Sequence, residues 1–247
     1  MNRFMIVVNP DKDTDSTVTN RIQSYLEAHG AACMVRDVFH LESSDWEALK
    51  KEQFDCVLVL GGDGTLLRMA GETEDIDIPL FGINLGTVGF LTEGEVANIE
   101  EILDRLLTDD FTIEERMMVT GTVTKADGTT YRKSALNDIV ISRAGFSRLI
   151  GLNVSVDGQV LDTYEADGVV ISTPTGSTGY NLSAGGPIVS PDAELLVITP
   201  VSPHSLTAKS IVLSGKEEIT IEITKKRKTQ DLSLIHISEP TRRTPIS

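Results

Sequence analysis

A cluster of glycines directly after a run of apolar residues constrains this chain more than any other feature. Residues 57–60 read Val-Leu-Val-Leu, and residues 61–65 continue as Gly-Gly-Asp-Gly-Thr. A short apolar run that ends in a turn signal is typical of a strand buried in a parallel sheet. Glycines there let backbone N–H groups approach a phosphate, because no Cβ stands in the way. The segment therefore predicts an α/β fold with a phosphate-binding loop.

The first 110 residues alternate between apolar runs and amphipathic stretches. We expect strands at residues 3–9, 31–38, 56–60 and 79–83, and helices at 14–29, after Ser43 or Ser44, from 65 and at 95–107. This alternation predicts a parallel sheet with helices on both faces. We therefore place an α/β N-terminal domain with a parallel sheet, carrying the 61–65 loop, at residues 1–110.

The pattern changes near Asp110, after which strand-like runs predominate. They lie at residues 111–124, 129–142, 149–156, 159–165, 168–173, 194–199, 208–214 and 218–224. Ala126-Asp127-Gly128 and Asp157-Gly158 are hairpin signals between successive runs. We predict a β-rich C-terminal domain at residues 111–231.

Residues 232–247 depart from both patterns. They follow a basic run at 225–228 and contain two prolines without amphipathic spacing. One interpretation is a disordered tail. We favour another, because the segment resembles a translated sequencing-adapter sequence joined to a truncated reading frame. On that interpretation the tail is non-native, the native C-terminus is missing, and His236 has no function.

Composition excludes several classes of function. The formal net charge of −15, from 37 acidic and 22 basic residues, disfavours nucleic acid as a partner. No apolar stretch is long enough to span a membrane, and the N-terminus does not read as a signal peptide. The two cysteines, Cys33 and Cys56, lack metal-ligand spacing. We expect a cytoplasmic protein that binds no membrane.

The richest motif is the second glycine-rich segment, residues 167–187, which reads DGVVISTPTGSTGYNLSAGGP. A requirement for tight turns explains its glycines but not its many hydroxyl side chains. Tyr180 could stack on a base or close a pocket. Asp167 either binds ligand or caps the following turn, and we favour ligand because this residue opens the motif.

Two further positions carry candidate chemistry. Asp63 is either a capping residue of a tight strand-to-helix turn or a carboxylate that accepts the proton of a substrate hydroxyl about 3 Å away. Asn137 and Asp138 interrupt the apolar pattern of residues 135–142. They mark a strand edge or bulge, or they read a sugar or base through hydrogen bonds.

Four blocks in this order resemble the bacterial NAD kinase family. They are GGDGT, LND, DGVVISTPTGSTGYNLSAGGPI and PVSPHSL, and the resemblance covers residues 1–224. It implies a two-domain fold with NAD between the domains, and transfer of a phosphoryl group from ATP, or in some members polyphosphate, to the adenosine 2′-hydroxyl of NAD. It also implies a divalent cation, usually Mg²⁺, and a homodimer or homotetramer if the C-terminus is intact.

The resemblance also implies roles for individual residues. Asp63 matches the catalytic base and Gly64 a neighbouring backbone contact, while Asn137 and Asp138 match an Asn-Glu pair that binds NAD. The other cofactor-binding matches are Arg68, Arg148, Asp167, Thr178, Gly179, Tyr180, Asn181, Leu182 and Ser183. Two of these positions depart from the family pattern, since Asp138 is one methylene shorter than the usual Glu and Gly179 replaces the usual Ala.

Three other hypotheses stay open at this point. A lipid kinase of the diacylglycerol or sphingosine type shares GGDGT, but the acidic composition and the hydroxyl-rich segment argue against it. A non-catalytic protein that binds NAD or NADP is disfavoured by the intact Asp63. The third hypothesis is that the chain is a truncated fragment without activity.

Overall fold

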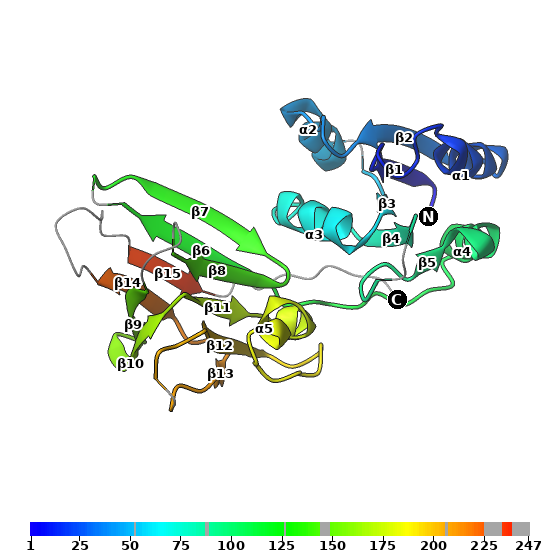
Figure 1. The fold of residues 1–247 in the computed structure, drawn as a ribbon. Coiled ribbons are helices and arrows are strands. Elements are labelled where there is room, and N and C mark those ends of the chain that lie inside the picture. Colours follow the sequence, from blue (N-terminus) through cyan, green and yellow to red (C-terminus); the bar gives the residue numbers. More distant parts are fainter. Residues whose placement is uncertain are drawn as a thin grey trace. The chain divides into compact units, whose positions relative to one another are not determined.

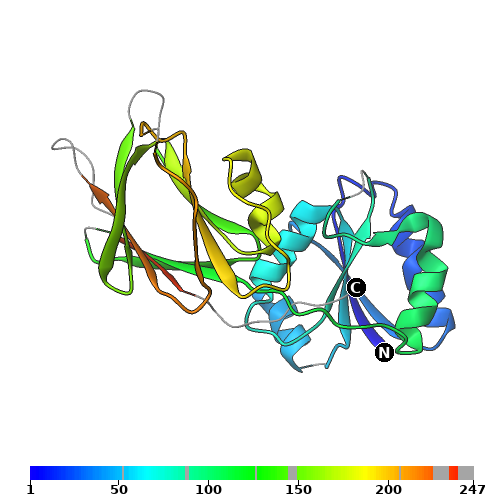
Figure 2. The same cartoon turned by 90° about the horizontal axis from the view of Figure 1, so that it is seen from below.

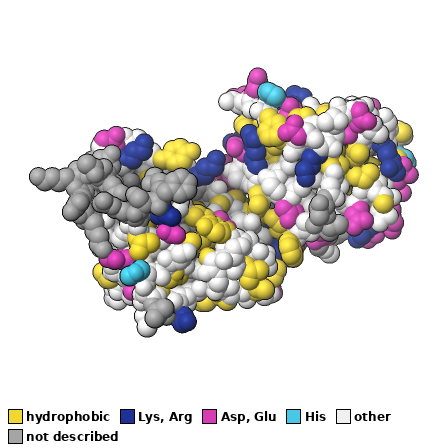
Figure 3. Space-filling model, viewed as in Figure 1, with side chains coloured by type: hydrophobic (Ala, Val, Ile, Leu, Met, Phe, Trp, Pro, Cys, Tyr) yellow, Lys and Arg dark blue, Asp and Glu magenta, His cyan; other side chains and the backbone are white. Residues whose placement is uncertain are grey.

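The computed structural model describes residues 1–51, 53–86, 89–125, 127–143, 149–205, 207–224 and 234–238. The chain forms two compact units, unit 1 (Met1–Glu115) and unit 2 (Arg116–Arg242) (Figure 1). No helix among the described residues is long and apolar enough to cross a membrane. Figure 3 shows acidic and basic side chains interspersed over the face of unit 1 that it displays.

Unit 1 alternates strands and helices, as the sequence predicts. Its elements are β1 (Arg3–Val8), α1 (Thr17–Ala28), β2 (Ala32–Asp37), α2 (Ser43–Lys51), β3 (Cys56–Gly61), α3 (Asp63–Glu72), β4 (Leu80–Asn84), β5 (Gly94–Glu95), η1 (Val96–Asn98) and α4 (Ile99–Leu107). The strands form one parallel sheet in the order β2-β1-β3-β4-β5. The chain runs from β1 to β2 on one side and returns to β3 on the other. The strand order therefore reverses between β1 and β3, where ligands of open α/β sheets bind.

The sheet of unit 1 is covered by helices on both faces. Figure 2 shows α1 and α4 on one face and α2 and α3 on the other. Leu26 of α1 and Leu103 of α4 pack with Ile6 and Leu58 of the strands in one buried cluster. Every residue of β3 is buried, which explains why this strand reads as a continuous apolar run.

Unit 2 is built from antiparallel strands. They are β6 (Val119–Thr124), β7 (Thr130–Ala135), β8 (Asp138–Ser142), β9 (Ile150–Val156), β10 (Gln159–Ala166), β11 (Gly168–Ser172), β12 (Leu195–Val201), β13 (Ile211–Ser214), β14 (Ile219–Thr224) and β15 (Leu234–Ser238), with η2 (Thr175–Thr178) and α5 (Tyr180–Ser183) between β11 and β12. One sheet has the order β10-β9-β14-β15-β6-β7 and the other β13-β12-β11-β8. A single buried cluster includes Leu152 and Ile221 of the first sheet and Ile171 and Ile198 of the second, so the two sheets share a core.

The fold class is confirmed: a parallel α/β unit precedes a β-rich unit. The predicted hairpin at Asp157-Gly158 is confirmed too, with both residues at positive φ (48° and 77°), as a type I′ turn requires. One prediction was wrong in detail. The run 129–142 is not one strand, because the chain bends at Leu136 and Asn137 and places β7 and β8 in different sheets.

The predicted tail at residues 232–247 contains one described element. Leu234–Ser238 form β15, whose backbone pairs with β14 on one side and β6 on the other. Five residues of the segment thus belong to the larger sheet of unit 2. The non-native origin of the segment stays a prediction.

Candidate functional site

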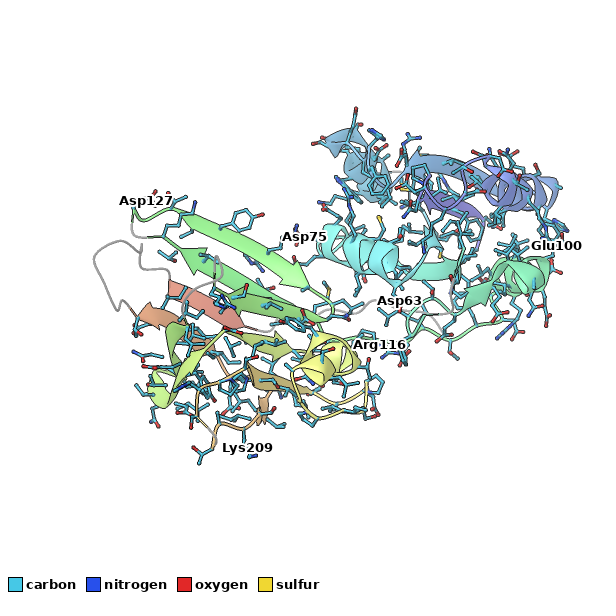
Figure 4. The ribbon with its side chains drawn as sticks, viewed as in Figure 1. Asp63, Asp75, Glu100, Arg116, Asp127 and Lys209 are labelled. Carbon is cyan, nitrogen blue, oxygen red and sulfur yellow. The ribbon has the colours of Figure 1, made fainter. Side chains whose placement is uncertain are left out.

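The glycine loop of unit 1 joins the carboxyl end of β3 to α3. Gly62 is extended (φ −139°, ψ −174°) and Asp63 begins the helix, where Figure 4 labels it. Gly61 has no room for a side chain, because a Cβ would overlap the Thr65 side chain. The first glycine is therefore needed for packing, while Gly64 is exposed and a Cβ there would meet nothing within 4 Å.

Four hydrogen bonds hold the carboxylate of Asp63. Its Oδ2 accepts from the Phe90 N–H (2.8 Å), and its Oδ1 accepts from the Leu91 N–H, the Thr92 N–H and the Thr92 hydroxyl (3.1 Å each). A carboxylate has about four acceptor positions, two on each oxygen. Among the bonds to described residues, Oδ1 is thus saturated and Oδ2 retains room for one more donor. Asp63 therefore does more than cap its helix, because its side chain fixes a segment 27 to 29 residues away.

Gly89 lets this arrangement form. A Cβ on Gly89 would overlap the carboxylate of Asp63, so the chain can pass beside that carboxylate only as glycine. Thr92, which supplies two of the four hydrogen bonds, is itself buried. The loop 89–92 and the Asp63 side chain thus pack tightly against each other.

Arg68 lies on the exposed side of α3. Its guanidinium lies 5.7 Å from the centre of the Phe39 ring, and the positive charge helps to lower the pKa of Asp37. Burial acts in the opposite direction on Asp37, but hydrogen bonds from Phe39 and His40 outweigh it. Arg68 thus lies beside Asp37 and Phe39, at the carboxyl end of β2.

In unit 2 the hydroxyl-rich segment packs against Asn137. The Thr173 N–H donates to the Asn137 carbonyl (2.8 Å), and the Thr173 hydroxyl donates to the Leu136 carbonyl (2.5 Å). A Cβ on Gly176 would overlap the backbone of Asn137, so this glycine permits a close approach. The bend between β7 and β8 therefore has a function in packing, since it receives the loop after β11.

Asn137 and Asp138 lie together beside Gly179. A Cβ on Gly179 would be 3.5 Å from the Asn137 Nδ2 and 3.8 Å from the Asp138 Oδ2. Burial raises the pKa of the Asp138 carboxyl above its usual range. The buried Asn137 Oδ1 and Thr175 Oγ1 have no hydrogen-bond partner among the described residues. Unpaired buried polar atoms are costly, so this group is suited to a polar ligand.

Asn181 is buried, whereas its neighbours Tyr180 and Leu182 are exposed. Its side chain is fully buried, and its Nδ2 donates to the carbonyls of Ser177 (3.0 Å) and Pro187 (2.9 Å). Its Oδ1 accepts from the Thr199 hydroxyl (2.7 Å). The amide therefore ties both ends of the loop to β12, and it positions the loop instead of facing solvent.

The remaining residues of the stretch face outward. Tyr180 and Leu182 are each 45% exposed, Ser183 is exposed, and Thr178 is half-buried. Only the short η2 and the four-residue α5 lie in this stretch, so a helix dipole contributes little to binding and the side chains contribute more.

Asp167 is held by an ion pair. The Arg143 Nε lies 2.6 Å from the Asp167 Oδ1, and the Arg143 N–H donates to the Asp167 carbonyl (2.9 Å). The Asp167 carboxylate is partly exposed and can still contact a ligand, but the ion pair with Arg143 sets the orientation of this carboxylate. Arg148, another predicted contact, lies outside the described residues.

Sequence reasoning missed three contributors: the loop 89–92, Arg143 and Thr199. Each acts through a partner at least 18 residues away in the chain. Gly89 was the available signal, because a glycine soon after a predicted strand often marks a close approach. Nothing in the local sequence identified Arg143 or Thr199.

Both units match models of known domain families. Residues 4–111 match the ATP-NAD kinase N-terminal domain, and residues 136–240 match the ATP-NAD kinase C-terminal domain.

Curated relatives agree with the family models. The chain is 46% identical over 235 residues to the NAD kinase of Lachnoclostridium phytofermentans, which covers 94% of this chain and 82% of that protein. It is 44% identical over 234 residues to the NAD kinase of Agathobacter rectalis, with the same coverage.

Two solved structures share the fold. A yeast NADH kinase complexed with NADH aligns at a TM-score of 0.83, with 22% identity, over 100% of this chain and 83% of the other. An NAD kinase from Archaeoglobus fulgidus in complex with ATP aligns at a TM-score of 0.74, with 27% identity, over 98% and 92%.

Gly89→Ala should disable the Asp63 arrangement. The added methyl group would overlap the carboxylate and displace it from its four hydrogen bonds. We expect a loss of about 100-fold in NADP formation from NAD and ATP, the size expected for misplacing a reacting group by about 1 Å. The unfolding midpoint is measured in parallel, and turnover within about threefold of the unchanged chain would contradict the role of this glycine.

Asn181→Ala should loosen the loop after β11. It leaves the Ser177 and Pro187 carbonyls without their buried donor, at a cost of about 1–3 kcal/mol in the free energy of unfolding, while the Thr199 hydroxyl keeps Ser210 as a partner. We also expect KM for NAD to rise more than kcat falls. Asn153→Ala is the matched control, since that side chain accepts an exposed bond from Thr163 on β10. Equal effects of the two variants would refute a positioning role.

Asp138→Asn should make the chain more stable and the NAD site weaker. Because its pKa is raised in the folded protein, ionised Asp138 costs stability above that pKa and costs nothing below its unfolded value, about 3.9. The unfolding midpoint of the variant should therefore exceed that of the unchanged chain near pH 7, and the gap should close at about pH 3. Asp127→Asn should show the opposite sign near pH 7, because hydrogen bonds from Thr129 lower the pKa of Asp127.

Proposed function

The chain belongs to the ATP-NAD kinase family, and from that premise we propose that Asp63 accepts the proton of the NAD hydroxyl that takes up the phosphoryl group. Membership makes the chain a phosphotransferase that uses ATP and NAD. The observation that carries the proposal is the fixed carboxylate of Asp63 at the carboxyl end of β3, with one acceptor position left on Oδ2 among the bonds to described residues.

The transfer is a single in-line displacement. The adenosine 2′-oxygen of NAD bonds to the γ-phosphorus of ATP while the bond from that phosphorus to the bridging oxygen breaks. The hydroxyl proton passes to Asp63, and ADP leaves. Such a transfer depends on positioning and charge stabilisation more than on covalent chemistry. The loop 89–92 supplies the positioning, since its three N–H groups prevent the carboxylate from rotating.

Unit 2 supplies groups for recognising NAD. The Asn137 amide and the Asp138 carboxylate can bond sugar hydroxyls or an amide, and exposed Tyr180 offers a ring face for stacking. Gly64, Arg68, Asp167, Thr178, Gly179, Leu182 and Ser183 complete the contacts we propose, and Asn181 holds the loop that carries them.

The divalent cation fits a particular mode of binding. Among the residues that the structure describes, no group of three or more His, Cys, Asp or Glu side chains could hold a metal. Mg²⁺ is usually held by one or two carboxylates together with substrate phosphates. We therefore assign it to the phosphates of ATP. When bound, it offsets phosphate charge.

The two alternative functions lack this support. The matched family models and curated relatives are NAD kinases, which does not favour a lipid kinase. A sensor that binds NAD without turnover would have no need for a carboxylate held in one orientation at Asp63. By resemblance to the family we also propose a homodimer or homotetramer in the cytoplasm.

NADP formation tests the function directly. The purified chain is incubated with NAD, ATP and Mg²⁺, and NADP is measured with an NADP-specific dehydrogenase. Asp63→Asn should keep NAD affinity within about threefold and lose at least about 100-fold in kcat, because the amide cannot take up the proton. Near-normal turnover of this variant would remove Asp63 from the mechanism.

If the unchanged chain forms no NADP, the same assay is repeated with sphingosine or diacylglycerol as the acceptor. A phosphorylated lipid would replace the proposed function. Binding of NAD without any product would favour the sensor.

A further inference from the structure

The side chain of Lys12 lies over the glycine loop of unit 1. Lys12 belongs to the connection between β1 and α1, and its Nζ lies 3.0 Å from the position that a Cβ on Gly62 would take. The same Nζ lies 3.4 Å from the corresponding position on Gly86, in the loop after β4. The ammonium thus occupies space that side chains at positions 62 and 86 would otherwise fill.

The backbone that carries Lys12 is anchored to the sheet. The Asn9 N–H donates to the Leu60 carbonyl (2.9 Å), and the Lys12 N–H donates to the Asn9 carbonyl (3.0 Å). The buried Asp13 accepts from the Val18 and Thr19 N–H groups (3.1 and 2.8 Å), which joins the loop to the first turn of α1. A lysine held in this way starts close to the glycine loop and loses less freedom on binding an anion.

No residue in the described part of the chain neutralises the charge of Lys12. No hydrogen bond or ion pair joins its ammonium to any residue that the structure describes. The nearby Asp13 is committed to α1, including a 2.5 Å bond from the Thr19 hydroxyl, and Asp63 is committed to the loop 89–92. In a chain with a net charge of −15, an ammonium without a partner among the described residues is a distinct local feature at this point.

Its position in the sheet indicates what it could bind. Lys12 follows β1 and Gly62 follows β3, and the strand order reverses between these two strands. Ligands of open α/β sheets bind at this reversal, outside the carboxyl ends of the strands. Gly62, beside the Lys12 ammonium, directly precedes α3, and the N-terminus of a helix favours an anion. The matching chemistry is a polyphosphate chain.

We propose that the Lys12 ammonium binds the phosphate oxygens of the phosphoryl donor and offsets the negative charge that grows there during transfer. This inference rests on the proposed function and extends it, because it names a residue for the donor that the sequence did not single out. The lysine acts as a mobile point charge with three N–H donors, which suits a phosphate chain that shifts as its terminal bond breaks.

Steady-state kinetics of Lys12→Met separates donor binding from acceptor binding. We expect kcat/KM for ATP to fall by roughly 10- to 100-fold, the loss of one hydrogen bond between charged groups, with KM for NAD within about twofold. Lys12→Arg should recover most of the loss. Lys50→Met is the matched control. Lys50 is exposed in the last turn of α2, and the chain after α2 enters β3 at the amino end of that strand, opposite to the glycine loop.

A binding measurement keeps this test independent of turnover. Inorganic tripolyphosphate is titrated into the unchanged chain and into Lys12→Met by calorimetry, and the Kd should rise by roughly 10- to 100-fold in the variant alone. An unchanged Kd, or a rise in KM for NAD without one for ATP, would overturn the role of Lys12. If the unchanged chain makes no NADP, the proposed function fails, and the tripolyphosphate titration still decides whether Lys12 binds phosphate.

Discussion

The hydrogen bonds to the Asp63 carboxylate are the interaction on which the rest of the candidate site in unit 1 depends. Asp63 begins α3, two residues after the end of the buried strand β3, and its carboxylate accepts four hydrogen bonds from the loop 89–92. One acidic side chain thus joins the loops that follow β3 and β4. A group held by so many bonds keeps one orientation, which suits the role that we propose for it, because phosphoryl transfer depends on positioning.

The glycines of this chain serve two different purposes, although the sequence shows them alike. Gly61, Gly89 and Gly176 are required because a Cβ would overlap Thr65, Asp63 and Asn137 respectively. Gly64 meets no such obstacle. At Gly62 the obstacle is the flexible end of Lys12, so the missing side chain leaves space for a cation and its ligand. Only the first group is needed for packing, and at Gly62 and Gly64 the missing Cβ leaves the backbone open to the phosphates of the proposed donor.

Unit 2 balances stability against recognition. Asp138 is partly buried with a raised pKa, and the Asn137 and Thr175 side chains each keep a buried oxygen unpaired among the described residues. These features cost stability in the free protein, and binding a polar ligand would offset that cost. The fully bonded Asn181 shows the contrast, because its amide stabilises the loop whose outward side chains are left for the ligand.

The sequence by itself determined the fold class, most strands of both units and the two glycine-rich segments, because burial and turns leave local patterns of apolar residues, glycine and proline. It could not determine which loops meet. The bend at Asn137, the bonds from Phe90–Thr92 to Asp63, the Arg143–Asp167 pair and the place of Lys12 join residues far apart in the chain. Such contacts depend on strand order and register, which bring together groups whose local sequences carry no sign of one another.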